Sequence, residues 1–571
     1  MKKYRIQILI CAGIVSLTNV AAQQQQKNDS TVNRTVVVEN QYNPEVMDAF
    51  KVNVLPKIDE PAVAKTQIEY ASSVHQVNKF PVCHIDVMNR EIPEDKVRRG
   101  YVRLSYGSRN NADLKGAYLW NITDHDVIDV MSALHGYSGD IVAGYDFEPA
   151  TDIPVLNQDK EWSHRFFRTS ASVKYTHDFD KLSMCIGGDF ASQVFSYIPD
   201  INQDEDYLQN KEKTNTPSFG HQLFMSGEGY VGVSSVKDAL PVEFSFQTVY
   251  KKFSRKHDAY IQGSLSENVV HTHGYVSAGI DGRQDIGVAL GMDNVFYNQM
   301  FDNYSLIKLR PYYSVSTESV SFTAGINADF QISNDGGLKL SPDVRFDYTF
   351  AGNYVLYAYV TGDTRLNDFG TINGFTPFWI WRPQLNTSYT PYDIRLGFKS
   401  SPLTGFGLGI YGGYRETKDE FFSMPCADGG GIYNRIEQAK ARVAYAGLSV
   451  DYSFRDMLDV GFAGNLYDWN VPKGMERLLW LKPLYSIGLN ASVKVLKDFH
   501  AIAGYTYEER KKTMGIKTDA VNELNIGAEY LFDERVNVFL KLNNLFNKNY
   551  VTESGYPVQG LNAMAGVSLN F

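Results

Sequence analysis

The chain has 571 residues, of which 43% are hydrophobic, a fraction typical of folded proteins and too high for a disordered chain. It carries 65 acidic and 55 basic side chains, and the net charge of −10 argues against nucleic acid as a partner, because nucleic-acid binders need a basic surface. The four cysteines are too far apart for a zinc site or a disulfide framework. They are Cys11, Cys83, Cys185 and Cys426.

The unusual feature of the composition is its content of aromatic residues and glycine. The chain contains 37 Tyr, 33 Phe and 6 Trp beside 46 Gly. With ordinary overall hydrophobicity, this composition favours β-strands that have two different faces.

Residues 1–22 have the pattern of a secretory signal peptide. A basic start at 1–5 is followed by an apolar stretch at 6–15 and by small residues that end at Ala22. Beyond residue 22 no run of 18 or more apolar residues occurs, so we expect no membrane-spanning helix. If the chain crosses a membrane, it must do so as a closed β-barrel.

Residues 23–97 are interpreted as an extended periplasmic leader without a full plug domain. Prolines interrupt its short apolar pieces, so little core is expected there. These prolines are Pro44, Pro56, Pro61, Pro81 and Pro93.

From residue 98 to residue 571 the chain consists of segments of about ten residues that alternate apolar and polar side chains. In the last segment, apolar residues from Leu561 to Phe571 alternate with small or polar ones. Segments 485–495 and 536–543 repeat the pattern, with Lys494 and Lys541 on the polar face. A lysine is costly in a dry core but not in a wet lumen, so this face is expected to line water.

The connections between these segments alternate in length. Tight turns are expected at 454–456, 496–498 and 532–535, and longer loops at 415–437, 468–480 and 546–560. Short periplasmic turns and longer extracellular loops are typical of an outer-membrane barrel. We therefore predict an all-β, antiparallel transmembrane β-barrel of about 22 strands, within a range of about 18–26, whose first strand lies near Tyr101. A secreted sandwich or propeller is the alternative fold.

The C-terminal third resembles the end of a TonB-dependent receptor barrel. The resemblance rests on the motif Asn544-Leu545-Phe546-x-x-x-Tyr550, followed by Gly555-Tyr556-Pro557 and a last strand that ends in Phe571. Members of that family usually carry an arginine after the later glycine, where this chain has Leu561 after Gly560. In view of the short leader, the whole chain resembles plugless TonB-receptor-like barrels of Bacteroidetes.

Two further segments have counterparts in such barrels. The last strand, with Val567, Leu569 and Phe571, resembles the signal that the barrel assembly machinery reads by strand pairing. In the leader, a short β-prone segment resembles a TonB box, which docks onto a TonB-like coupling protein as an added strand. That segment is Thr35, Val36, Val37 and Val38.

The segment 375–383 concentrates aromatic rings beside a cation in a predicted extracellular loop or its descending strand. Aromatic faces with a neighbouring arginine can stack on a sugar or another planar ligand. The candidate ligand-binding residues are Phe378, Trp379, Trp381 and Arg382. Alternatively, Trp379 and Trp381 both face lipid as interfacial anchors.

Other chemistry is not expected. His271 and His273 share one side of a strand but lack an adjacent acidic or cysteine ligand, so we predict an ordinary wall pair, with no metal and no cofactor. The residues considered for catalysis are His125, His135, His164, Ser132 and Ser138. The motifs Gly-x-Ser-x-Gly and His-Glu-x-x-His are absent beside them, so we predict no enzymatic activity.

The sequence therefore predicts an outer-membrane protein of a Gram-negative bacterium that transports or receives an unidentified solute. The alternative is a non-conducting accessory subunit of an outer-membrane assembly, secretion or uptake complex, held by other outer-membrane proteins. Transport is favoured, because a wall of 22 strands encloses a large space. Outer-membrane lipid is the expected surrounding.

Overall fold

The computed structural model describes 99–147, 153–199, 222–237, 239–257, 265–298, 301–333, 336–380, 385–428, 431–532, 535–553 and 555–571. These residues belong to one compact unit, 73–571. The predicted signal peptide and leader, and with them the TonB-box-like segment, lie outside the described residues.

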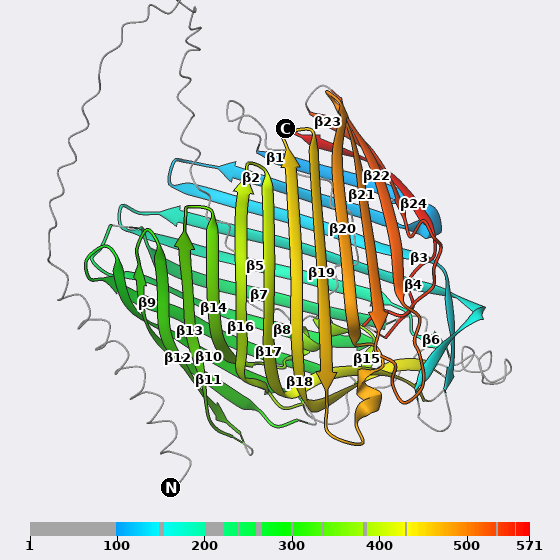
Figure 1. Ribbon diagram of the computed structural model, residues 1–571, viewed down its shortest axis with the longest axis horizontal. Coiled ribbons are helices and arrows are strands. Elements are labelled where there is room, and N and C mark those ends of the chain that lie inside the picture. Colours follow the sequence, from blue (N-terminus) through cyan, green and yellow to red (C-terminus); the bar gives the residue numbers. More distant parts are fainter. Residues whose placement is uncertain are drawn as a thin grey trace, which may run out of the picture. The chain divides into compact units, whose positions relative to one another are not determined.

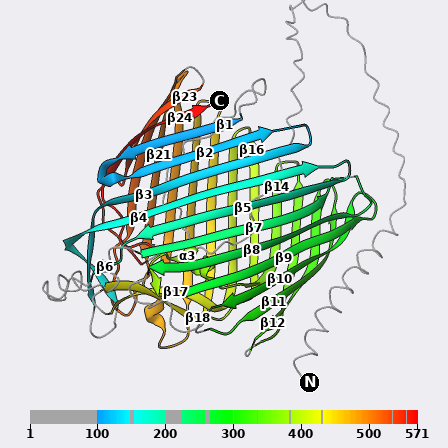
Figure 2. The ribbon, with the colours of Figure 1, turned by 180° about the vertical axis from the view of Figure 1, so that it is seen from behind.

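The described residues form a closed antiparallel β-barrel of 22 strands, which confirms the predicted fold and strand number (Figures 1 and 2). Each wall strand pairs with the wall strands before and after it in the chain, and β1 pairs with β24, with Tyr101 opposite Asn570. The sheet therefore has no free edge, and the sandwich and propeller alternatives do not hold.

The wall strands are β1 (Gly100–Gly107), β2 (Ala112–Asn121), β3 (Asp126–Phe147), β4 (Pro154–Asp178), β5 (Leu182–Phe195), β7 (Gln222–Ser235), β8 (Glu243–His257), β9 (Leu265–Gly279), β10 (Gln284–Tyr297), β11 (Tyr304–Ser316), β12 (Val320–Ile332), β13 (Gly337–Phe350), β14 (Tyr354–Arg365), β16 (Ser388–Leu403), β17 (Phe406–Asp428), β18 (Gly431–Phe454), β19 (Leu458–Asn470), β20 (Pro483–Leu496), β21 (Phe499–Arg510), β22 (Val521–Phe532), β23 (Val536–Asn543) and β24 (Asn562–Asn570). The connections contain β6 (Ile198–Pro199), β15 (Trp379–Ile380), η2 (Ser108–Asn110), α3 (Phe369–Phe375) and η3 (Glu476–Leu479).

The two ends of the barrel differ in their connections. At one end, here called the turn end, short turns such as 455–457 and 497–498 join the strands, as predicted. At the other, the loop end, lie the longer connections, including 471–482 and 544–561. The predicted long loop at 415–437 is wrong: β17 and β18 continue as a hairpin to Asp428 and Gly431, because their ends pack into an apolar core instead of lying free in solvent.

Side chains alternate between the two faces of the wall as the sequence predicts. On β23, Val538 and Leu540 are exposed on the outer face, whereas Phe539 and Lys541 point inward. Lys541 does not lie in open water as expected, since it is only 7% exposed. Its ammonium lies over the Phe539 ring, 5.6 Å from the centroid, so neighbouring inner-face side chains cover it.

Outward-facing aromatic rings gather near both ends of the wall. At the turn end they include Tyr348, Phe454, Tyr530 and Phe571, and at the loop end Tyr106, Phe296 and Tyr414. Two such bands flanking an apolar outer surface are typical of barrels that sit in a bilayer. In the described part of the chain, no helix is long and apolar enough to cross a membrane.

Tyrosine and glycine are paired across neighbouring strands of the inner wall. At each paired glycine an added Cβ would lie 2.2 to 2.5 Å from ring atoms of the tyrosine opposite, so only glycine lets the ring lie flat on the wall. The pairs are Tyr230 with Gly187, Tyr312 with Gly287, Tyr357 with Gly397, Tyr411 with Gly447, and Tyr445 with Gly413. The pairing gives five of the tyrosines and five of the glycines a joint structural role.

Parts of the inner wall remain accessible to solvent. Met131, which lies opposite Ala117 and Ser172 on the inner face, is 50% exposed. Tyr275 and Leu119, also on the inner face, are exposed too. A filled core would bury such side chains, so the described residues do not fill the lumen between these strands.

Candidate functional site: a cap on the loop end

A folded cap closes the loop end of the barrel. It consists of 366–380, which contains α3 and β15, of β6, of the hairpin end 421–436, and of the loops 471–482 and 544–561. Its buried aromatic side chains form one core with side chains from the wall. The largest fully buried ones include Tyr197, Phe369, Trp379, Phe421, Phe422, Trp469 and Trp480.

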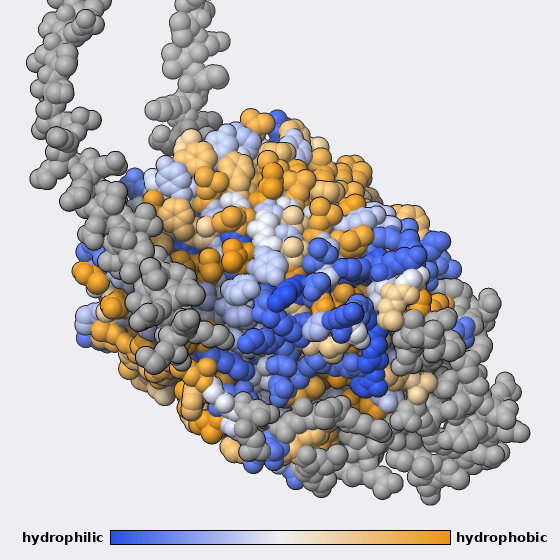
Figure 3. All heavy atoms as spheres, turned by 60° about the horizontal axis from the view of Figure 1, so that its bottom comes forward, coloured by the Kyte–Doolittle hydropathy of each residue, from blue (hydrophilic) through white to orange (hydrophobic). Residues whose placement is uncertain are grey.

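The cap spans the mouth of the barrel. β6 directly follows β5 in the chain, yet it pairs with β18, which lies on the opposite side of the wall, with Ile198 opposite Ile432. β15 also pairs with β18, in parallel, with Trp379 opposite Asn434. Figure 3, which brings the bottom of the view in Figure 1 forward, shows hydrophilic residues gathered in the middle of that face. The lumen is therefore covered by folded protein at the loop end.

Helix α3 depends on its surroundings, because its sequence has weak helix propensity, with two glycines among seven residues. Asp368 caps its start, since the carboxylate accepts the backbone N–H of Thr371 at 2.8 Å. Phe369, Ile372 and Phe375 are buried along one face and fix the helix in the cap.

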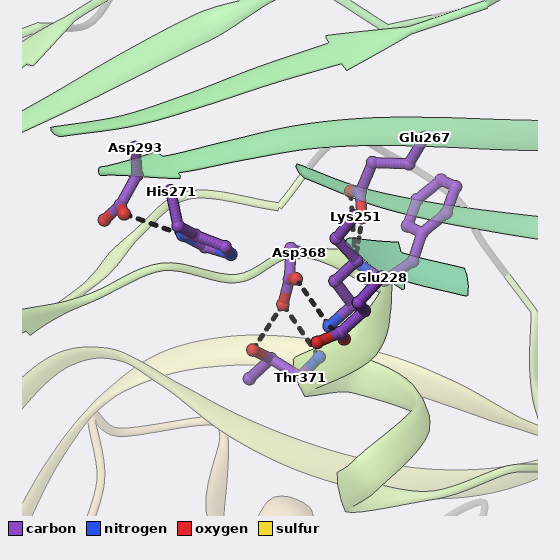
Figure 4. A network of polar contacts seen from close by, with 8 residues as sticks. Glu228, Lys251, Glu267, His271, Asp293, Asp368 and Thr371 are labelled. Atoms are coloured by element: carbon purple, nitrogen blue, oxygen red, sulfur yellow. Dashed lines mark hydrogen bonds and ion pairs between the residues drawn. The ribbon is translucent and has the colours of Figure 1, made fainter. Parts of the chain in front are cut away.

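Charged side chains of the neighbouring wall strands hold the N-terminal end of this helix (Figure 4). Glu267 on β9 is fully buried, and its two carboxylate oxygens accept the backbone N–H of Phe369 at 2.9 and 3.0 Å. The ammonium of Lys251 on β8 lies 3.4 Å from the Asp368 carboxylate and 3.5 Å from that of Glu228. A buried carboxylate is costly without such partners, so these contacts tie α3 firmly to β8 and β9.

Arg255 makes a second connection between wall and cap. Its guanidinium lies between two rings, 4.4 Å from the centroid of Phe224 and 4.3 Å from that of Trp379. It also donates hydrogen bonds to the Tyr197 hydroxyl at 3.0 Å and to the Trp379 carbonyl at 3.1 Å. A planar guanidinium can stack and donate at once, which a lysine at this position could not do.

The Gly555-Tyr556-Pro557 motif, which resembles that of TonB-dependent receptors, packs the last loop into the cap. The Tyr556 ring stacks on Phe378, and its hydroxyl donates to the Ile432 carbonyl at 2.6 Å. Gly555 has a φ of 77°, and an added Cβ would lie 2.3 Å from an oxygen of Asn434, so glycine is required there. Its carbonyl accepts the hydroxyl of buried Tyr145 at 2.9 Å.

A cluster of buried charges lies where loops 471–482 and 544–561 meet the top of β21. Lys482 faces Glu553 at 3.6 Å, and Arg510 contacts Glu508 at 2.7 Å. Arg510 also donates to the Val551 carbonyl at 2.9 Å. Burial raises the pKa of the Glu553 carboxyl above its usual range, although Lys482 and Arg510 oppose the shift.

The candidate ligand-binding residues fall partly within the cap. Trp379 is 0% exposed and Phe378 6% exposed, so neither ring presents a free face. Trp379 is not an interfacial anchor as the alternative proposed, because it is enclosed by Arg255, Phe224 and Phe369. Trp381 and Arg382 lie outside the described residues.

The other candidate residues are placed as follows. His271 donates a hydrogen bond from Nδ1 to the Asp293 carboxylate at 2.7 Å on the inner wall, and the described residues contain no cluster of three or more metal-ligating side chains. Val567, Leu569 and Phe571 are exposed on the outer side of the last strand. Their role as an assembly signal stays a prediction.

Sequence reasoning missed Lys251, Arg255 and Glu267, which connect wall and cap. The available signal was a set of charged residues at inward positions in the loop-end parts of β8 and β9. Such residues indicate contact with something other than water, but not which segment provides it.

No protein-family model and no curated protein matches the chain. Its structure is similar to that of the ferric enterobactin receptor PfeA of Pseudomonas aeruginosa, with a TM-score of 0.63 at 11% identity, covering 83% of this chain and 81% of that one. It is also similar to the siderophore receptor PirA of Acinetobacter baumannii (TM-score 0.62, 10% identity, 83% and 80% covered) and to the copper transporter OprC (TM-score 0.59, 10% identity, 83% and 80% covered). The fold is thus that of receptor and transporter barrels, which confirms the resemblance at the level of fold.

Proposed function

We propose that the protein is an outer-membrane transport or receptor barrel whose cap is a closed outer gate. The observation that carries the proposal is an inner wall that is accessible in part to solvent and is covered at one end of the barrel by a folded cap. The apolar outer face with its two aromatic bands supports a place in the outer membrane of a Gram-negative bacterium. The similarity to receptors for iron chelates and to a copper transporter supports transport as the activity.

In this proposal the turn end faces the periplasm and the loop end faces the outside. The leader 23–97 follows the signal peptide 1–22 and lies in the periplasm, in place of the plug that resembling receptors carry. Val36 and Val37 belong to a TonB-box-like strand that a TonB-like coupling protein binds. The barrel assembly machinery inserts the chain through its last strand, and the plugless barrels of Bacteroidetes are the group it resembles.

Conductance in planar lipid bilayers tests the gate. The full-length protein is expected to be closed, whereas replacement of 369–380 by a short glycine-serine linker should give large, steady current steps, because that segment belongs to the cap and not to the wall. Replacement of η2 by glycines is the control, since this loop-end connection lies outside the cap core. Gel mobility with and without heating checks that both variants remain folded barrels.

A silent barrel after removal of 369–380 would overturn the transport proposal. It would favour the alternative, a non-conducting accessory subunit. The fully buried aromatic core of the cap supports that alternative, because a permanently closed barrel would have such a core. Stoichiometric co-purification with other outer-membrane proteins would then be expected.

The coupling segment is tested separately. Proline at positions 36 and 37 removes two backbone donors and should abolish capture of the chain by a purified TonB-like periplasmic domain. Undiminished capture would contradict the role of the segment while leaving the gate untouched.

A further inference from the structure

Two cations stand next to each other on the outer face of β18 and share one carboxylate. Nζ of Lys440 lies 2.7 Å from Oε1 of Glu416 on β17, and Nε of Arg442 lies 2.8 Å from Oε2 of the same carboxylate. Lys440 and Arg442 are called the cation pair below. Ala441 and Val443, which alternate with them along the strand, are buried in the core on the inner side, so the cation pair faces outward.

The cation pair has one positive charge in excess and N–H groups to spare. The side chains of Lys440 and Arg442 are 40% and 48% exposed, whereas that of Glu416 is 10% exposed. Only Nε of the Arg442 guanidinium donates to Glu416, and its terminal nitrogens have no partner among the described residues. Glu416 therefore holds the two cations in position, while most of their N–H groups remain available to a second anion.

The cation pair lies at the level that lipid headgroups occupy. Exposed Tyr414 belongs to the aromatic band at the loop end, and its ring stacks on that of Tyr392, 6.3 Å between centroids. Glu416, which lies opposite Arg442, is two residues closer to the loop end, about 7 Å along the strand. The headgroup layer extends about 5–8 Å beyond the hydrocarbon, so the cation pair falls within it.

The outer face below the cation pair suits an acyl chain. On the same side of the wall, toward the middle of the barrel, Leu396 on β16 and Ile410 on β17 are exposed together with Tyr414. An apolar strip that leads up to two cations matches a ligand with a hydrocarbon tail and an anionic head.

We propose that the cation pair binds the phosphate monoester of a glycolipid of the lipid A class in the outer leaflet, which rests on the proposed function only for the orientation of the loop end. A phosphate monoester carries about 1.5 to 2 negative charges at pH 7, against one for the diester of a glycerophospholipid, and so suits two cations better. The planar guanidinium of Arg442 donates to two phosphate oxygens, and Lys440 adds a point charge.

Native mass spectrometry of the full-length protein tests the site, with diphosphoryl lipid A as the probe and phosphatidylglycerol as the diester match. The wild type is expected to bind lipid A about ten-fold more tightly than phosphatidylglycerol. The double variant Lys440→Gln, Arg442→Gln should lose this preference. Gel mobility with and without heating checks that it remains a folded barrel.

The double variant Lys252→Gln, Lys517→Gln is the matched control and should keep the preference. Lys252 is an exposed cation two residues beyond exposed Tyr250 on β8, and Lys517 pairs singly with Glu509 at 2.8 Å. Both variants remove two positive charges, but only the first removes two cations that share one carboxylate.

Equal binding of both lipids, an unchanged preference without the cation pair, or an equal loss in the control variant would each overturn the proposal. Inorganic phosphate that displaces lipid A at equal concentration would assign the site to the free anion and overturn the lipid as its ligand. The cation pair lies on the outer face, whereas the gate is the segment 369–380. A silent bilayer with selective lipid binding would therefore remove the transport proposal alone, and open channels without lipid preference would remove this inference alone.

Discussion

The aromatic rings of Phe378 and Tyr556 lie face to face, with their centroids 3.6 Å apart and 7° between their planes. The first belongs to 366–380 and the second to the loop 544–561, which the sequence separates widely. Because Tyr556 also reaches β18 through the Ile432 carbonyl, the pair joins three parts of the cap. The cap is therefore expected to open and close as one unit.

Phe378→Ala should loosen the cap without opening the wall. The variant loses the buried ring and its stacking contact with Tyr556, which should lower the unfolding free energy of the cap by about 3–5 kcal/mol. Hydrogen exchange of the amides at 369–380 is expected to accelerate, while that of β20 stays unchanged. Phe546→Ala is the control, because Phe546 is an exposed ring at the same end; equal acceleration in both variants would contradict a specific role of the stack.

A charge on the outer face in the middle of the wall should destabilise the barrel in lipid. Leu489 is exposed in the middle of β20, so Leu489→Arg is expected to cost about 2–4 kcal/mol in urea unfolding from lipid vesicles. Asn490→Arg, one residue on and facing the lumen, should cost far less. Val493 lies closer to the turn end, and Val493→Arg should cost about 0–1 kcal/mol. Equal effects at 489 and 490 would contradict the assignment of faces.

The two inner-face lysines should respond differently to removal. Lys541→Ala loses a covered ammonium over Phe539 and is expected to cost about 1–2 kcal/mol. Lys494→Ala should cost about 0–1 kcal/mol, because its partner Asp456 is largely exposed to solvent. Urea unfolding of both variants side by side measures how much unfolding free energy each loses. A larger loss in Lys494→Ala than in Lys541→Ala would contradict the burial of Lys541.

The docking of the last loop should weaken as the pH rises. Because burial raises the pKa of Glu553 in the folded state, its docked form favours the protonated carboxyl. That contribution is complete below the ordinary glutamate pKa and is lost as the pH passes through the raised value. Hydrogen exchange at 550–553 and 555–558, corrected for intrinsic rates, is expected to show less protection at pH 8 than at pH 5.

Glu553→Gln should abolish most of this pH difference, because the amide does not titrate and has nearly the same shape. A variant that keeps the full wild-type difference would assign the dependence to another group.

The barrel itself was predictable because its signal is local. On β23 and β24 most side chains are apolar on the outer face and small or polar on the inner face. The tight turns between strands are specified by two or three adjacent residues. The error at 415–437 arose where this signal ends: the β17–β18 hairpin buries both of its faces in the cap, so that alternation is lost although the strands continue.

The cap was not predictable, because it is made of contacts between distant segments. Glu267 and Phe369 are 102 positions apart, and nothing near either residue identifies the other. The aromatic segment around Trp379 was recognised, but aromatic rings serve equally in a ligand site, a membrane interface and a core. Only the position of Arg255 inside the barrel decides in favour of the core.

The pairing of β1 with β24 also sets the order in which the chain can mature. The backbone N–H groups of Arg99 and Gly100 donate to the carbonyl of Phe571, so the cylinder cannot close until β24 is present. A chain that lacks β24 would leave β1 and β23 with unsatisfied backbone groups, which favours aggregation. Closure through the last strand therefore makes an open, unfinished sheet an unfavourable end state in lipid.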